Sequence, residues 1–152
     1  MMTRTLTPIL AALMLSIAPM ASAGPLAEAA GPSASADEKV VYHVNDSDNA
    51  TAAMRNINNH LNADKTAKIV VVTHSKGIDF LLDGAKDANG NSYDALVAVA
   101  KSRGVEFRVC RNTLTSRKID ESKVIPDATI VQSGVAEVSR LQAQEKFVYL
   151  KP

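Results

Sequence analysis

The sequence predicts an α/β fold, in which helices cover both faces of a mostly parallel sheet of five or six strands. Segments with strand character alternate along the chain with segments whose apolar residues recur at helical spacing. The strand segment 67–73 (AKIVVVT) is almost continuously apolar, as strands covered on both faces of a parallel sheet are. Helical connections of about ten residues between such strands imply right-handed crossovers, which keep the strands parallel.

The first half of the folded unit is predicted to contain two strand-helix pairs. A β-branched strand at 39–44 ends in turn-forming residues at 45–48. The next apolar residues mark one face of a helix: Ala50, Ala53, Met54, Ile57 and Leu61. After the strand at 67–73 we predict a short strand at 78–82 and a loop at 87–92 (DANGNS). A second helix then ends at Gly104 and is marked by Tyr93, Leu96, Val97 and Ala100.

The second half repeats the pattern. The strand at 105–110 places its alternate residues on opposite faces, with Val105, Phe107 and Val109 on one and Glu106, Arg108 and Cys110 on the other. A polar connection closed by Pro126 leads to a strand at 128–132. A turn, a helix and a final strand at 147–151 follow, the helix being marked by Val135, Val138 and Leu141.

Composition excludes several classes of function. The 152 residues include 17 Lys and Arg against 16 Asp and Glu, so no basic surface points to a nucleic acid. The glycine-rich nucleotide and phosphate motifs, the hydrolase motif GxSxG and the redox motif CxxC are all absent, and we expect no cofactor. One cysteine forms neither an internal disulfide nor a cysteine-rich zinc site.

The N-terminus is typical of a secretory signal peptide at 1–23. One positive charge, Arg4, precedes a ten-residue apolar run, and Ala21-Ser22-Ala23 supplies the small residues of a cleavage site. The run is half the length needed to span a membrane. Residues 24–37 are rich in Ala, Gly, Pro and Ser and form a flexible leader, which leaves 38–152 as the folded domain. We therefore expect a periplasmic or secreted protein without a membrane span after processing.

The carboxyl edge of the predicted sheet is where a ligand or a reaction is expected in such folds. Just past the predicted strand ends lie Asn45, Asp46, His74, Ser75, Cys110, Arg111, Asn112, Ser133 and Gly134. Several of these also suit turns and helix caps, whatever the function. A metal site built from His43, Asp46, His74 and Cys110 is not expected, because these residues lie at no ligand spacing and on different elements.

Cys110 is the residue most suited to chemistry. It lies where a strand gives way to a polar loop, and Arg108, Arg111, Arg117 and Lys118 are near enough in sequence to stabilise a thiolate. Asn112 adds a short polar group that can orient the loop. The alternative is that Cys110 is a small buried apolar residue with no chemical role.

Three segments resemble the DsrE/DsrF-like family of sulfur-relay proteins: 104–114 (GVEFRVCRNTL), 128–138 (ATIVQSGVAEV) and 140–152 (RLQAQEKFVYLKP). The resemblance implies a flavodoxin-like three-layer sandwich and a homotrimer or homohexamer. It further implies that Cys110 takes up sulfane sulfur as a persulfide and passes it between a donor and an acceptor protein.

Two functions from different classes follow. The first is a thiol-based sulfur carrier, with Cys110 as the acceptor, Arg111 and loop N–H groups as stabilisers of its anionic forms and Asn112 as an orienting group. The second is an oligomeric, non-catalytic binding module that holds a small anion in the same strand-end cleft, with Cys110 structural. The candidate binding residues of this cleft are Arg111, Asn112, Asn45, His74, Ser133 and Gly134.

Overall fold

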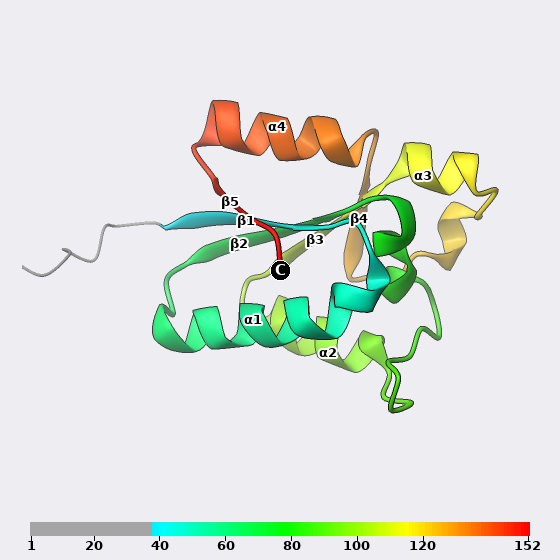
Figure 1. The fold of residues 1–152 in the computed structure, drawn as a ribbon, viewed down its shortest axis with the longest axis horizontal. Helices are drawn as coiled ribbons and strands as arrows, with labels where there is room; N and C mark the ends of the chain where they lie inside the picture. Colours follow the sequence, from blue (N-terminus) through cyan, green and yellow to red (C-terminus); the bar gives the residue numbers. More distant parts are fainter. Residues whose placement is uncertain (1–37) are drawn as a thin grey trace, which may run out of the picture. The chain divides into compact units, whose positions relative to one another are not determined.

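The computed structural model describes residues 38–152, which form one five-stranded parallel sheet flanked by helices (Figure 1). The predicted signal peptide and leader lie outside the described residues. The sheet order is β4-β3-β2-β1-β5. The strands are β1 (Lys39–Val44), β2 (Lys68–Thr73), β3 (Glu106–Cys110), β4 (Ala128–Val131) and β5 (Val148–Leu150).

The helices make three layers with the sheet, which confirms the predicted α/β sandwich. Helices α1 (Ala50–Ala63) and α2 (Tyr93–Ser102) cover one face, and α4 (Gly134–Glu145) covers the other (Figure 1). Helix α3 (Arg111–Ser116) follows β3 without a gap. Short 3-10 helices complete the list: η1 (Ser47–Asn49), η2 (Ser75–Leu81) and η3 (Glu121–Lys123).

Alternation of side chains along the strands builds a separate apolar core on each face of the sheet. On the α4 face, Val41, Val70 and Val72 pack with Val138 and Leu141. The larger core on the opposite face includes the residues between these valines and the buried face of α1. Both faces of the central strands are therefore buried, which is why the segment 67–73 is so continuously apolar.

The parallel register aligns the carboxyl ends of the strands on one edge. Val44 pairs with Thr73 and Thr73 pairs with Val109, so the residues that follow β1, β2 and β3 emerge side by side. Cys110 pairs with Val131 of β4. This edge holds all the candidate residues that the strand ends predicted.

Two segments differ from the prediction. The short strand expected at 78–82 is wrong, because residues 75–81 form η2 and bury Ile78, Phe80 and Leu81. Burial of adjacent positions 80 and 81 fits a helical turn and not the strict alternation of a strand. The connection after Cys110 was expected to be a polar loop, but it begins with α3, which buries Thr113 and Leu114.

None of the helices within residues 38–152 is both long enough and apolar enough to cross a membrane.

Candidate functional site

Cys110 lies at the carboxyl end of β3, directly before α3. It shares a sheet face with Arg108, whose guanidinium bonds Glu137 of α4, and its side chain faces the start of that helix. The residue is only 3% exposed. The sulfur is thus buried, yet it lies beside the polar ends of two helices.

Polar groups at the beginnings of α3 and α4 affect the pKa of the Cys110 thiol. Burial raises the pKa of the thiol, but the backbone N–H of Gly134, the hydroxyl and N–H of Thr113 and the N–H of Asn112 outweigh it, and the net pKa is lowered. Donors of this kind stabilise the charged form directly. The site therefore favours a thiolate although the sulfur is buried, a combination that neither sequence-based alternative for Cys110 describes by itself.

Gly134 is required by this arrangement because α4 begins very close to the sheet. A Cβ atom at Gly134 would lie 2.9 Å from the Thr73 carbonyl oxygen and 3.2 Å from the Cβ atoms of both Cys110 and His74. The missing side chain lets the first N–H group of α4 reach the sulfur. Gly134 thus has a role in the site beyond forming a turn.

Thr113 connects the thiol to the loop after β2. Its Oγ1 accepts a hydrogen bond of 3.0 Å from the Ser75 N–H, which leaves its own hydrogen free to donate to Cys110. Ser75 has a left-handed backbone, with φ of 53°, and its carbonyl oxygen accepts a hydrogen bond of 3.2 Å from Arg117. Contacts from α3 thus hold a strained residue beside the site.

The arginine expected to stabilise the thiolate is engaged elsewhere. The Arg111 Nε donates to Glu121 Oε1 at 2.7 Å in an exposed ion pair. Asn112 lies beside the site, where its backbone N–H donates to the Gln132 carbonyl oxygen at 3.3 Å and its side-chain oxygen accepts from the Gln132 amide at 3.0 Å. Backbone and hydroxyl groups therefore supply the hydrogen bonds that the sequence analysis assigned partly to arginine.

Three further candidates have structural contacts. Ser133 caps α4 by accepting a hydrogen bond of 3.4 Å from the Ala136 N–H. The backbone of Asn45 lies against Gly77, where a Cβ atom would come within 2.8 Å of the Asn45 Cα. Asp46 caps η1, as its place in a turn predicts.

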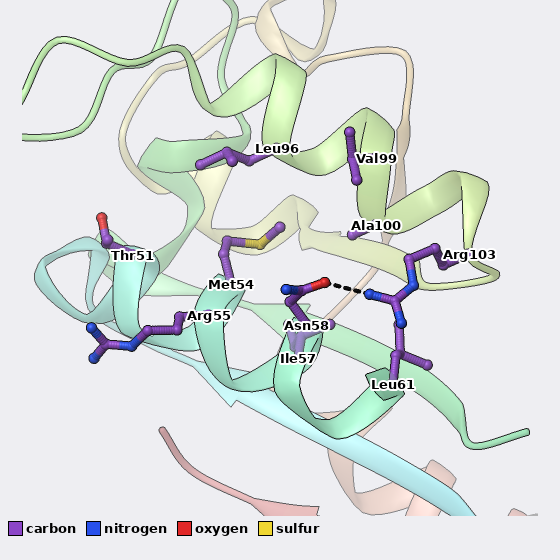
Figure 2. Close-up of a pocket in the computed structure, with 10 residues that line it drawn as sticks. All are labelled: Thr51, Met54, Arg55, Ile57, Asn58, Leu61, Leu96, Val99, Ala100 and Arg103. Atoms are coloured by element: carbon purple, nitrogen blue, oxygen red, sulfur yellow. Dashed lines mark hydrogen bonds between the residues drawn. The ribbon is translucent and has the colours of Figure 1, made fainter. Parts of the chain in front are cut away.

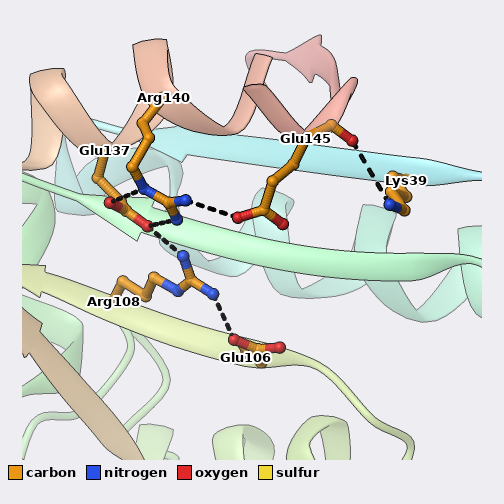
Figure 3. A network of polar contacts seen from close by, with 6 residues as sticks. All are labelled: Lys39, Glu106, Arg108, Glu137, Arg140 and Glu145. Carbon is orange, nitrogen blue, oxygen red and sulfur yellow. Dashed lines mark hydrogen bonds and ion pairs between the residues drawn. The ribbon is translucent and has the colours of Figure 1, made fainter. Parts of the chain in front are cut away.

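A network of ion pairs holds α4 over β3 (Figure 3). The nearly buried carboxylate of Glu137, which is 12% exposed, pairs with Arg108 of β3 and with Arg140 of its own helix. The hydrogen bond from Arg140 lowers the pKa of Glu137, burial opposes this shift, and Arg108 adds to the lowering. Because Glu137 lies one turn after Gly134, the network fixes the helix end that contacts Cys110.

His74 reaches a partner that sequence reasoning missed. Its Nε2 lies 2.6 Å from the Nε2 of His43, and the Nδ1 of His43 lies 2.8 Å from the Tyr149 hydroxyl. His43 precedes the end of β1 by one residue, and Tyr149 is inside β5, so a search beyond the strand ends overlooks both. Within residues 38–152, no group of three or more His, Cys, Asp or Glu side chains is arranged to hold a metal ion.

An apolar pocket of about 370 Å³ lies between α1 and α2 (Figure 2). It is lined by residues such as Met54, Leu96 and Val99, and Arg103 borders it and bonds Asn58. These helices cover the sheet face opposite α4 (Figure 1). The pocket therefore lies on the other side of the sheet from the donors that surround Cys110.

Replacing Thr113 with valine is expected to raise the pKa of the Cys110 thiol, because one donor to the sulfur is lost. Loss of one hydrogen bond corresponds to a roughly 2- to 10-fold slower alkylation by iodoacetamide near neutral pH. Thr113→Ser keeps the hydroxyl and should retain the wild-type rate. Arg111→Ala is the matched control, since its guanidinium pairs with Glu121. A pH profile that shifts in the Arg111 variant but not in the Thr113 variant would contradict this assignment.

The fold and the site define a parallel α/β protein with a single cysteine held by helix-end donors at the carboxyl edge of its sheet. The chain belongs to the DsrE/DsrF-like family, whose model matches residues 38–150.

Solved structures share the fold. A protein of unknown function from Methanobacterium thermoautotrophicum, MTH1491, is 26% identical, with a TM-score of 0.68 over 76% of this chain and all of that one. The ychN protein of E. coli shares the fold, with 14% identity and a TM-score of 0.63 over 76% of this chain and 99% of that one. No curated protein matches the sequence significantly.

Proposed function

We propose that this protein is a thiol-based sulfur carrier that holds sulfane sulfur as a persulfide on Cys110. The observation that supports this most is the position of Cys110 beside the beginnings of α3 and α4, whose polar groups lower the pKa of its thiol. The thiolate is the form that attacks sulfur, so these donors favour uptake. Membership of the DsrE/DsrF-like family agrees with such a role.

In this proposal the site residues have distinct tasks. Cys110 accepts the sulfur. Gly134 supplies an N–H group, and Thr113 supplies both an N–H and a hydroxyl. The partners are a sulfur donor and an acceptor protein, which reach the carboxyl edge of the sheet.

Mass spectrometry of the purified protein after exposure to polysulfide or thiosulfate tests the function. A gain of one sulfur atom on Cys110, removed by a reducing thiol, is the expected result. An unmodified Cys110 after both reagents would favour the second function, an oligomeric binding module for a small anion. The 3% exposure of Cys110 is the observation that favours that alternative.

We also propose that the protein assembles as a homotrimer or homohexamer. Strand β5 is an edge of the sheet, and its Val148, Tyr149 and Leu150 side chains are 57%, 39% and 39% exposed. Unpaired strand edges with apolar side chains are natural sites of association. Light scattering at micromolar concentration should give three or six times the chain mass, and a monomer mass would contradict the assembly.

Export is the last part of the proposal and rests on the sequence 1–23, outside the described residues. We expect the mature chain to begin at Gly24 and to be periplasmic or secreted. N-terminal sequencing of the protein from fractionated cells checks this. A chain that begins at Met1 in the cytoplasmic fraction would contradict it.

A further inference from the structure

A chain of polar side chains runs along the carboxyl edge across β5, β1 and the loop after β2. The Tyr149 hydroxyl lies 2.8 Å from His43 Nδ1, and His43 Nε2 lies 2.6 Å from His74 Nε2. The chain ends at Ser75, whose Oγ lies 2.9 Å from His74 Nδ1. Each of these groups can both donate and accept a hydrogen bond, so a proton can shift along the whole chain.

The short contact between the two Nε2 atoms limits the protons that the histidines can hold. One of these nitrogens must donate and the other must accept. With both rings neutral, either His43 donates to His74 or His74 donates to His43. In both cases the hydroxyls of Tyr149 and Ser75 can rotate to donate to, or accept from, the Nδ1 atoms. One added proton keeps every hydrogen bond, whereas a second would place hydrogens on both Nε2 atoms and break the contact. The pair is therefore built to take up and release one proton.

The pair is tied to the Cys110 site at two points. A Cβ atom at Gly134 would lie 3.2 Å from both the His74 and the Cys110 Cβ atoms, so these two side chains flank the start of α4 on one face. The backbone N–H of Ser75 donates to the Thr113 hydroxyl at 3.0 Å, and Thr113 in turn lowers the pKa of the Cys110 thiol. The loop that carries His74 and Ser75 thus contacts the residues that surround the thiol.

The surroundings keep both rings in the neutral form, which is the form that accepts a proton. Burial lowers the pKa of both histidines, His74 lowers that of His43 further, and the charge of Lys151 lowers both. Three titratable groups face the pair: Tyr149 in β5, Lys151 just after β5, and Cys110 at the end of β3. Both rings are therefore neutral near pH 7 and can receive the proton of a nearby thiol.

We propose that His43 and His74 form a proton-relay pair for thiol exchange at Cys110, an inference that rests on the proposed sulfur-carrier function. The pair takes up the Cys110 thiol proton, and the thiolate attacks the outer sulfur of a donor persulfide, R–S–SH. The S–S bond of the donor breaks as a new S–S bond forms on Cys110. The departing thiolate, RS⁻, then takes the proton from the pair and leaves as RSH. No oxidant or reductant is consumed.

A leaving-group comparison tests the relay. An alkyl thiolate is a strong base and needs a proton as it leaves, whereas an aryl thiolate leaves without one. We would measure the reaction of Cys110 in the full chain with bis(2-hydroxyethyl) disulfide and with 5,5′-dithiobis(2-nitrobenzoate) from pH 5 to 9. His43→Gln and His74→Gln should slow the alkyl reaction by about ten-fold or more near pH 7. The aryl reaction should slow less than the alkyl reaction, because the pair then acts only in removing the Cys110 thiol proton.

His60→Gln is the matched control. His60 lies on α1 and bonds the Tyr42 hydroxyl at 3.0 Å, so the same substitution there should leave both rates unchanged. A merely structural effect of the variants would alter access to the buried sulfur and change both rates together. An unchanged ratio of the two rates in both His43→Gln and His74→Gln would overturn the relay.

The same comparison separates the relay from the proposed function. Wild-type protein that exchanges with disulfides but gains no sulfur from polysulfide or thiosulfate would refute the sulfur carrier. The relay would still be judged by the ratio of the two rates.

Discussion

Replacing Cys110 with serine is expected to abolish sulfur uptake completely. The hydroxyl of serine is far less nucleophilic than a thiolate, and its oxygen does not form a persulfide. Cys110 is also the single cysteine of the chain, so no second thiol can compensate. Intact-mass spectrometry after polysulfide treatment should show one added sulfur in the wild type and none in the variant.

The fold of the Cys110→Ser variant should be retained, because serine is slightly smaller and can use the same hydrogen-bond donors. Circular dichroism and thermal unfolding provide that control. Sulfur bound to the folded variant in the same amount as to the wild type would show that uptake does not depend on Cys110. Loss of uptake together with loss of folding calls for the Cys110→Ala variant, judged by the same two measurements.

Replacing Gly77 with alanine is expected to produce the largest loss of stability. A Cβ atom there would lie 2.1 Å from the Val44 carbonyl oxygen and 2.6 Å from its carbon. Both atoms are backbone, so relief requires moving η2 away from the end of β1. Forced overpacking of this kind costs about 3 kcal/mol. For a domain of this size, that cost corresponds to a melting temperature lower by roughly 10 °C.

Lys76→Ala is the matched control for Gly77→Ala, since Lys76 is the exposed neighbour in the same 3-10 helix. It should change the melting temperature little. Thermal unfolding by circular dichroism compares the two. A Gly77→Ala protein as stable as the Lys76→Ala protein would contradict this prediction, because it would mean that η2 can move away from Val44 at little cost in free energy.

Much of the fold could be predicted from the spacing of apolar residues along the sequence. The residues that marked the helix after β1, among them Met54, Ile57 and Leu61, are buried as expected. The run 67–73 contains β2, which is covered on both faces. Its continuous apolarity predicted this, because strands that are buried on both faces of a parallel sheet have that pattern. The apolar residues at 78–82 led to the wrong prediction of a strand. Over five residues, the sequence patterns of a short 3-10 helix and of a short strand are alike, and packing against β1 decides between the two structures.

The candidate site was only partly predictable. The carboxyl-edge rule located Cys110, Asn112 and Gly134 because strand ends can be read from sequence. The same rule predicted that Arg111 lies near the sulfur. Proximity in sequence does not fix where a long side chain points, and the Arg111 guanidinium pairs with Glu121 instead. The pairing of His43 with His74 depends on the register of β1 against β2, which the sequence leaves open. Alternation along both strands is the signal that placed the two rings on one face.

The groups around the Cys110 sulfur come from parts of the chain that are synthesised at different times. Thr113 follows Cys110 almost at once, whereas Gly134 belongs to the helix after the next strand. A newly made, unfolded chain therefore contains a cysteine of ordinary acidity. The thiol meets the last of the groups that lower its pKa when α4 docks on the sheet, so the acidity of the thiol depends on completion of the fold.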